Sequence, residues 1–176
     1  MHDEALERLF RLYHAPLVRY LTRRLGDRDW AEEVAQETFL RALRQPSLAS
    51  ERAWLFAVAT NLVRDDARRE QRRRRHLQLL ADEARDAVAE PHERAVERAQ
   101  EAAWARRAVD ALAERDRLAL LMREEGLDYH EIAEALGLSV GSVGTTLSRA
   151  RRRLAEAYEE LQAQGAPRLG GSHGTR

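Results

Sequence analysis

The sequence predicts an all-α protein made of two small helical domains joined by a flexible linker, with a helix-turn-helix in the C-terminal domain. Apolar residues recur at helical spacing through most of the chain, and no segment shows the apolar-polar alternation of a strand. Two short helical patterns also meet at Gly137, within Leu127–Leu154. We expect a first domain at 1–76, an acidic linker at 77–101, a second domain at 102–160 and a disordered tail at 161–176.

The first domain should hold three amphipathic helices. The first two are expected at Glu4–Leu25, where Pro16 marks a kink or a break, and at Trp30–Arg44. A loop at Pro46–Ser50 separates them from a third helix that begins near Glu51. The third helix should bury Trp54, Leu55, Val58 and Leu62 and then enter the arginine-rich stretch Arg64–Arg75.

The linker prediction rests on composition. Residues 81–101 carry 3 arginines and 7 acids, a net charge of −4, and they contain no aromatic residue. Such a segment has little apolar surface to bury, which is typical of a linker. A further helix is expected at Trp104–Arg123, ahead of the helix-turn-helix.

The helix-turn-helix prediction rests on spacing. Gly137 can supply the positive φ that ends a helix, and Ser139 is placed to N-cap the next one. Ala133 and Val143 suit the close crossing of the two helices and the angle between them. Arginines at 149 and 151–153 then stand where a DNA backbone would lie. The alternative is an αα-hairpin with a solvated arginine face.

Composition excludes several classes of function. The chain has 176 residues and no cysteine, so it has no disulfide, thiolate nucleophile or cysteine-based metal site. Its 30 basic residues are all arginine and balance 30 acids. The histidines are scattered, and His130-Glu131 lacks the second histidine of a zinc protease, because position 134 is Glu134. We therefore expect no catalytic residues, no metal and no cofactor.

Three segments together resemble the extracytoplasmic-function (ECF) group of bacterial RNA polymerase sigma factors. Ala31–Ala42 (AEEVAQETFLRA) is similar to the helix that docks on the polymerase clamp. Trp54–Asn61 (WLFAVATN), with Asp65 and Arg68-Arg69, is similar to the helix that recognises the promoter −10 element. Leu127–Arg153 is similar to the helix-turn-helix that reads the −35 element. The resemblance covers roughly residues 5–75 and 104–158.

A polymerase-docking face is expected on Trp30–Arg44. A leucine beside an amide and acids, opposite the apolar stripe, is typical of an interface with an apolar centre and a polar surround. The resemblance implies clamp contacts by Glu33, Gln36 and Glu37. The alternative is an ordinary solvated helix face. The predicted core-polymerase-binding residues are Glu33, Gln36, Glu37, Leu40 and Arg41.

The −10 surface is expected around Asn61. Asparagine forms helices poorly, and its amide suits the Watson–Crick edge of an unpaired base. The resemblance implies that this helix and the loop Pro46–Ser50 capture a flipped −10 base. The alternatives are an internal hydrogen bond for Asn61 and a solvated helix end for the arginine run. The predicted −10 DNA-binding residues are Thr60, Asn61, Arg64, Asp65, Arg68 and Arg69.

The −35 surface is expected on the second helix of the helix-turn-helix. Gly144 and Thr146 stand where ECF recognition helices commonly place basic residues, so the sequence does not specify the −35 element that is read. The predicted −35 DNA-binding residues are Ser139, Ser142, Thr145, Thr146, Ser148, Arg149 and Arg152.

The resemblance implies a sigma factor that binds core RNA polymerase, directs it to promoter DNA and helps melt the −10 region. It also implies an anti-sigma factor as a partner. No apolar run approaches the ~20 residues of a membrane span, so we expect no membrane insertion and a cytoplasmic location. The alternative function is a two-domain transcriptional regulator that binds duplex DNA through its helix-turn-helix without core polymerase.

Overall fold

The computed structural model describes residues 3–45, 49–77 and 93–165, and all regular structure within them is α-helical. This confirms the all-α prediction. The helices are α1 (Asp3–Leu25), α2 (Arg28–Leu43), α3 (Glu51–Leu77), α4 (Glu93–Asp110), α5 (Glu114–Glu124), α6 (Tyr129–Leu136) and α7 (Val140–Gly165). Within these ranges, no helix is long and apolar enough to cross a membrane.

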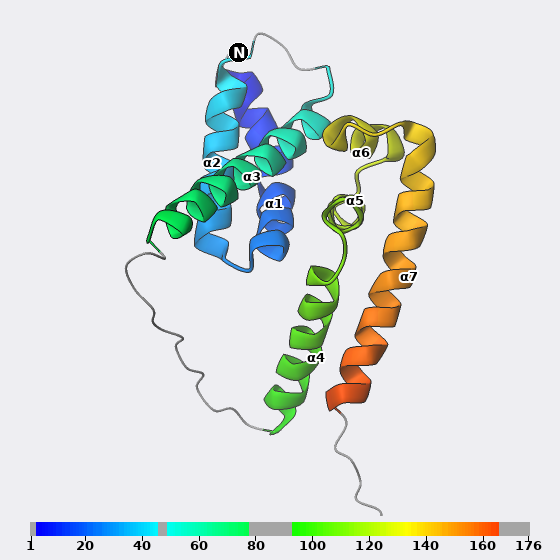
Figure 1. The fold of residues 1–176 in the computed structure, drawn as a ribbon. Helices are drawn as coiled ribbons and strands as arrows, with labels where there is room; N and C mark the ends of the chain where they lie inside the picture. Colours follow the sequence, from blue (N-terminus) through cyan, green and yellow to red (C-terminus); the bar gives the residue numbers. More distant parts are fainter. Residues whose placement is uncertain (1–2, 46–48, 78–92, 166–176) are drawn as a thin grey trace, which may run out of the picture.

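Helices α1, α2 and α3 pack around one apolar centre, with α3 crossing the other two (Figure 1). Leu9, Leu17 and Leu21 of α1 and Phe56 of α3 are fully buried there. Pro16 lies inside α1 and does not break it into two helices. Proline leaves the carbonyl four residues earlier without its helical donor. That residue is Leu12, which is exposed, so water can supply the missing hydrogen bond.

Helices α4 to α7 form the second half of the molecule. The long helices α4 and α7 lie side by side, and α5 packs against α7 near the helix-turn-helix of α6 and α7 (Figure 1). A small apolar cluster of Leu112, Leu120 and Ala150, with Leu154 against it, holds α5 and α7 together.

Three predicted elements differ from the structure. The single helix expected at Trp104–Arg123 is wrong, because the chain leaves the helical conformation between Asp110 and Glu114 and forms the two helices α4 and α5. Helix α4 begins at Glu93, inside the predicted linker, because its alanine-rich sequence favours a helix despite its charge. Helix α7 continues to Gly165, past the expected start of the tail. The rest of the predicted linker (78–92) and tail (166–176) lies outside the described residues, as do residues 46–48 of the predicted loop.

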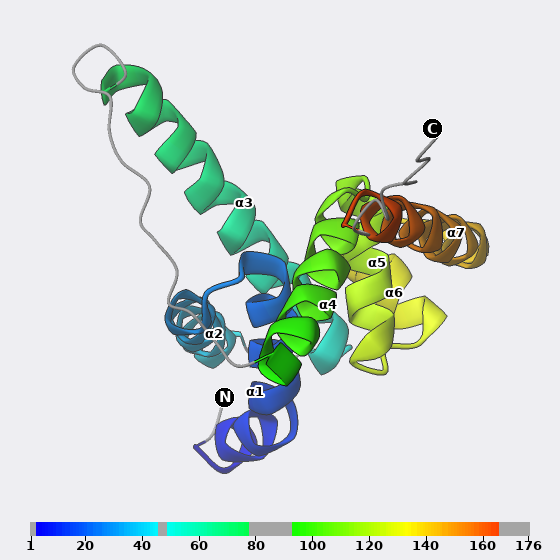
Figure 2. The same cartoon turned by 90° about the horizontal axis from the view of Figure 1, so that it is seen from below.

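The two halves are in contact. Helix α6 packs against α3, and α5 packs against α1. Buried residues of both halves belong to one apolar cluster, which includes Leu17 and Phe56 from the first half and Leu118, Ile132 and Leu147 from the second. The chain therefore adopts a closed arrangement, visible from below in Figure 2.

Candidate nucleic-acid and protein interfaces

The turn between α6 and α7 is fixed by local hydrogen bonds. Asp128 caps α6 by accepting from the backbone N–H of Glu131 at 2.8 Å, and the Glu131 carboxylate accepts from the N–H of Asp128 at 2.8 Å. This reciprocal capping box satisfies two amides that the helix leaves unpaired. At the other end, Gly137 has φ 64° and ψ 39°, the left-handed conformation predicted from its position.

The angle between α6 and α7 is filled by small and β-branched residues. Ala133 is 3% exposed and Val143 is fully buried, as the predicted spacing requires. The N–H of Leu138 donates to the carbonyl of Ala133 at 2.8 Å, which satisfies a terminal carbonyl of α6. The chain therefore has the geometry of a helix-turn-helix, with α7 in the position of the recognition helix.

The outer face of α7 carries part of the predicted −35 set. Ser139, Thr145, Ser148 and Arg152 are exposed, and Ser142 is half-buried. The Thr145 hydroxyl donates to the carbonyl of Ser142 at 2.9 Å, so its remaining capacity is as an acceptor. The prediction that Thr146 binds DNA is wrong. Thr146 is 4% exposed, because it lies on the inner face of α7 between Val143 and Ala150, and it cannot reach DNA from there.

Arg149, which also belongs to the predicted −35 set, is half-exposed and pairs with a carboxylate of α5. Its Nε donates to Oδ2 of Asp116 on α5 at 2.8 Å, and its Nη2 donates to Oδ1 of the same carboxylate. Asp116 is only 1% exposed, and the bonded guanidinium holds the pKa of its carboxyl below the usual range. Arg149 thus joins α7 to α5 in this structure, and its side chain is 41% exposed. Arg152 is more exposed, at 69%, and lies 3.7 Å from the Glu156 carboxylate one turn along α7.

The predicted −10 residues of α3 divide between the surface and the interior. Asn61 and Asp65 are exposed, and Arg64 is half-buried. The exposure of Asn61 disfavours the alternative of an internal hydrogen bond. The side chains of Arg68 and Arg69 lie outside the described residues.

The prediction that Thr60 binds −10 DNA is wrong, because Thr60 is fully buried. Its hydroxyl shares a 2.7 Å hydrogen bond with the hydroxyl of Tyr20, whose pKa burial raises. Thr60 therefore ties α3 to α1 and takes no part in a DNA surface in this conformation.

The predicted docking residues of α2 share one face. Glu33, Gln36, Leu40 and Arg41 are exposed, and Glu37 is half-exposed beside Arg41, which donates to it at 2.8 Å. The opposite face of α2 is buried, including Val34 and Phe39. Leu40 is 54% exposed, so this face has an apolar centre within a charged surround.

Comparison with known proteins decides the family. The models of Sigma-70 region 2 and Sigma-70 region 4 match residues 9–73 and 102–154. The chain is 30% identical over 159 residues to RNA polymerase sigma factor YlaC of Bacillus subtilis, covering 87% of this chain and 91% of that protein. It is 32% identical over 162 residues to ECF RNA polymerase sigma factor SigL of Mycobacterium tuberculosis, covering 87% and 88%. This chain belongs to the ECF sigma factors of bacterial RNA polymerase.

The fold agrees with this assignment. The ECF sigma factor matches the sigma factor RpoE of Bartonella quintana, solved in complex with the anti-sigma factor NepR, with a TM-score of 0.65 and 20% identity. The match covers 89% of this chain and 98% of that one. The protein is therefore a transcription initiation factor that directs RNA polymerase to promoters, as predicted, and the rival regulator without polymerase is not favoured.

Two exposed apolar residues beside the predicted surfaces of the sigma factor were not predicted from the sequence. Val140, 39% exposed, stands in the first turn of α7, where it could contact a base methyl group. Trp30, 36% exposed, lines a hollow of ≈ 190 Å³ between α2 and α3 with Glu33 and Glu37. The helical pattern indicates Trp30 only as the first residue of its helix. A signal for Trp30 was available, since it lies in the first turn of α2, three residues after the N-cap Asp27.

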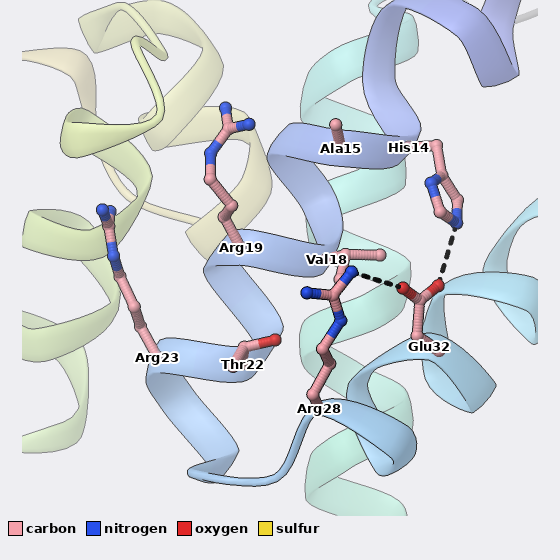
Figure 3. Close-up of a pocket in the computed structure, with 8 residues that line it drawn as sticks. All are labelled: His14, Ala15, Val18, Arg19, Thr22, Arg23, Arg28 and Glu32. Carbon is pink, nitrogen blue, oxygen red and sulfur yellow. Dashed lines mark ion pairs between the residues drawn. The ribbon is translucent and has the colours of Figure 1, made fainter.

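A cleft of ≈ 440 Å³ lies between α1 and α2 of the sigma factor. Figure 3 shows Glu32 between His14 and Arg28, with Arg19 and Arg23 turned away from it toward the second half of the molecule. Each of the three arginines lies within ion-pair distance of a carboxylate, so we assign no ligand to the cleft. Among the described residues, no group of three or more acids or histidines could hold a metal ion.

Proposed function

We propose that this ECF sigma factor uses three separate surfaces. The outer face of α2, made of Glu33, Gln36, Glu37, Leu40 and Arg41, binds core RNA polymerase. The exposed face of α3 around Asn61 captures an unpaired base of the −10 element. The exposed face of α7 reads the −35 element, and Arg152 contacts the DNA backbone.

The observation that carries this assignment is the exposure of chemically suitable residues on three helices whose opposite faces are buried. The helix-turn-helix supports −35 recognition, because its second helix projects hydroxyls and Arg152 to solvent next to a turn fixed by Gly137. Asn61 supports −10 capture, because an exposed amide offers both a donor and an acceptor to a base edge. Leu40 supports docking, since a half-exposed leucine gains free energy when a partner covers it.

The domain organisation is part of the proposal. We assign polymerase and −10 binding to residues 1–76 and −35 binding to 102–160, and the segment between them, which includes the first residues of α4, connects the two. The family also supports an anti-sigma factor as a regulatory partner, and action in the cytoplasm, where polymerase and promoter DNA meet.

A gel-shift experiment with and without core polymerase tests the function. The sigma factor and core enzyme are mixed with a pool of genomic fragments, and each is also tested alone. We expect a promoter-selective complex only when both proteins are present. Selective binding of duplex DNA by the protein alone would favour the regulator instead.

A further inference from the structure

The start of α7 and the turn before it carry no charged or amide side chain. Residues 138–148 read LSVGSVGTTLS. The N-terminal residues of a recognition helix are those that contact base edges in the major groove. In that groove, arginine and lysine make the bidentate contact with guanine, and asparagine and glutamine make the one with adenine. The segment of α7 that is placed to read bases therefore lacks every side chain that makes these contacts.

The first cation after this segment is already paired. Arg149 donates to both carboxylate oxygens of Asp116 on α5. Because Asp116 is buried, releasing Arg149 to the DNA would leave a buried carboxylate without its partner. Arg151, Arg152 and Arg153 are exposed, but they lie about three turns from the start of α7. They are better placed for phosphates than for the bases that the first turns of α7 approach.

The side chains that the start of α7 does expose are apolar or small. Val140 and Thr145 are exposed, and both carry methyl groups. At about 3.6 residues per turn, the exposed positions follow one another around α7 outside its buried stripe of Val143, Leu147 and Ala150. We define the α7 reading surface as Val140, Gly141, Gly144, Thr145 and Ser148.

Two hydroxyls at this surface are turned to the helix backbone. The Ser142 hydroxyl donates to the Ser139 carbonyl at 2.8 Å, and the Thr145 hydroxyl donates to the Ser142 carbonyl at 2.9 Å. A hydroxyl engaged in this way can still accept a hydrogen bond. An acceptor beside a methyl group complements a T·A pair, which presents the thymine methyl and the adenine N6 donor in the major groove. It does not complement guanine, whose N7 and O6 are both acceptors.

The two glycines of the reading surface are not required by the fold. A Cβ at Gly141 would have no atom within 4 Å, and a Cβ at Gly144 would meet only Cε2 of Tyr129, at 3.6 Å. Neither glycine has a positive φ. Glycine inside a helix is less favourable than alanine, so the fold alone would gain from replacing either. Their absent side chains let the backbone of α7 approach a base edge closely, which brings the methyl groups of Val140 and Thr145 within reach of it.

Tyr129 borders the reading surface from α6. Its ring is exposed, and the Arg123 guanidinium lies 5.7 Å from the ring centroid. Arg123 is itself held by a 2.8 Å hydrogen bond to the Leu127 carbonyl. Since the Tyr129 ring lies beside Gly144, a long side chain at position 144 would have to pass over it. The reading surface is therefore small, uncharged and bounded by an aromatic ring.

We propose that α7 reads the −35 element through thymine methyl groups. Val140 and Thr145 make the apolar contacts, and Arg152 binds a phosphate without base preference. The −35 element is therefore specified by T·A pairs, on either strand, and not by guanines. This inference rests on the proposed −35 role of α7 and names the base edges that α7 reads.

Replacing thymine by deoxyuridine tests the proposal, because it removes the methyl group and keeps the pairing with adenine. Holoenzyme, assembled from core polymerase and the full chain, first selects binders from copies of one of its promoters randomised around −35. We expect T·A pairs at the selected positions. Deoxyuridine at one or two of these thymines should weaken holoenzyme binding about fourfold, as for one buried methyl group. A −35 element specified by guanines, or one indifferent to deoxyuridine, would overturn the proposal.

Two variants assign the methyl contacts to residues. Val140→Ala and Thr145→Ser remove methyl groups and keep every hydrogen-bonding group. Each should bind the thymine and deoxyuridine promoters equally at one position. Arg152→Ala should weaken binding to both promoters and keep the fourfold difference, and Leu12→Ala, on α1, should change neither affinity. A fourfold difference that persists at every position in both methyl-deletion variants would refute the readout.

Gly144→Ala separates readout from folding. The added Cβ fits beside Tyr129, and alanine favours the helix, so the melting temperature should rise. Promoter binding by the holoenzyme should nevertheless weaken, because the Cβ holds the backbone of α7 away from the bases. Unchanged or tighter promoter binding would overturn the close approach on which the readout depends.

Failure of the proposed −35 function would give a different result. If the selection returned no preferred sequence around −35 and Arg152→Ala bound like the wild type, α7 would have no −35 role and both proposals would fall. A preferred sequence specified by guanines, bound more weakly by Arg152→Ala, would overturn the thymine readout alone.

Discussion

Replacing Leu40 by alanine should weaken binding to core polymerase by about fivefold without changing the fold. Fully burying a leucine side chain is worth roughly 1.5–3 kcal/mol. Leu40 is 54% exposed in the free protein, so docking can bury about half of it. Alanine retains part of that surface, and the loss is therefore about 1 kcal/mol, which corresponds to a fivefold rise in Kd. Titration of labelled sigma factor with core polymerase measures this directly.

Leu12 provides a matched control for this experiment. It is also a helical leucine and is 51% exposed, but it lies on α1, outside the proposed docking face. Leu12→Ala should leave the Kd unchanged, and both variants should keep the wild-type circular dichroism and melting temperature. Equal effects of the two substitutions on polymerase affinity would show that α2 does not present the docking surface.

Further substitutions test the DNA surfaces and the local structure. Asn61→Ala should cost ~1–3 kcal/mol in open-complex formation and blur preference at one −10 position, as seen in permanganate footprints of promoter variants, whereas equal loss on every variant would demote Asn61 to a structural role. Arg152→Ala should lower the salt slope of holoenzyme binding by about one, and an unchanged slope would exclude a phosphate contact. Gly137→Ala should lower unfolding free energy by about 1 kcal/mol in urea, because φ is positive although no atom lies within 4 Å of the new Cβ. The pKa of Asp116 is lower in the folded protein than in the unfolded chain, where it is near 4. The ionised Asp116 therefore stabilises the folded protein above that unfolded pKa, and this contribution is lost as the pH falls through the pKa of the folded state. The urea midpoint of Asp116→Asn should therefore approach the wild-type midpoint as pH falls from about 5 to 2, and a constant difference would refute the Arg149 pairing.

Local features were predictable from sequence because they depend on neighbouring residues. The glycine turn at Gly137 and the buried Ala133 and Val143 follow from spacing within one short segment. The outward face of α2 could also be predicted, because apolar residues such as Val34 and Phe39 define its inward face. In each case, helical periodicity and backbone preference are enough to predict the local structure.

Contacts between distant segments were not predictable from such patterns. Thr60 and Thr146 are buried because neighbouring helices cover them. The periodicity of one helix does not reveal which of its polar positions another helix will cover. The sequence indicates a free cation at Arg149, but Arg149 pairs with Asp116, which lies 33 residues earlier. Glu125 pairs with Arg19 and Arg23, which lie more than 100 positions earlier, and a single glutamate after α5 gives no sign of these pairs.

Transcription from genomic DNA with purified components tests the central claim most directly. Core polymerase is incubated with sheared genomic DNA with and without the sigma factor, and the 5′ ends of the transcripts are sequenced. We expect new start sites that appear only with the protein and share two sequence elements, one near −10 and one near −35. No new starts, or starts that share no upstream element, would contradict the account.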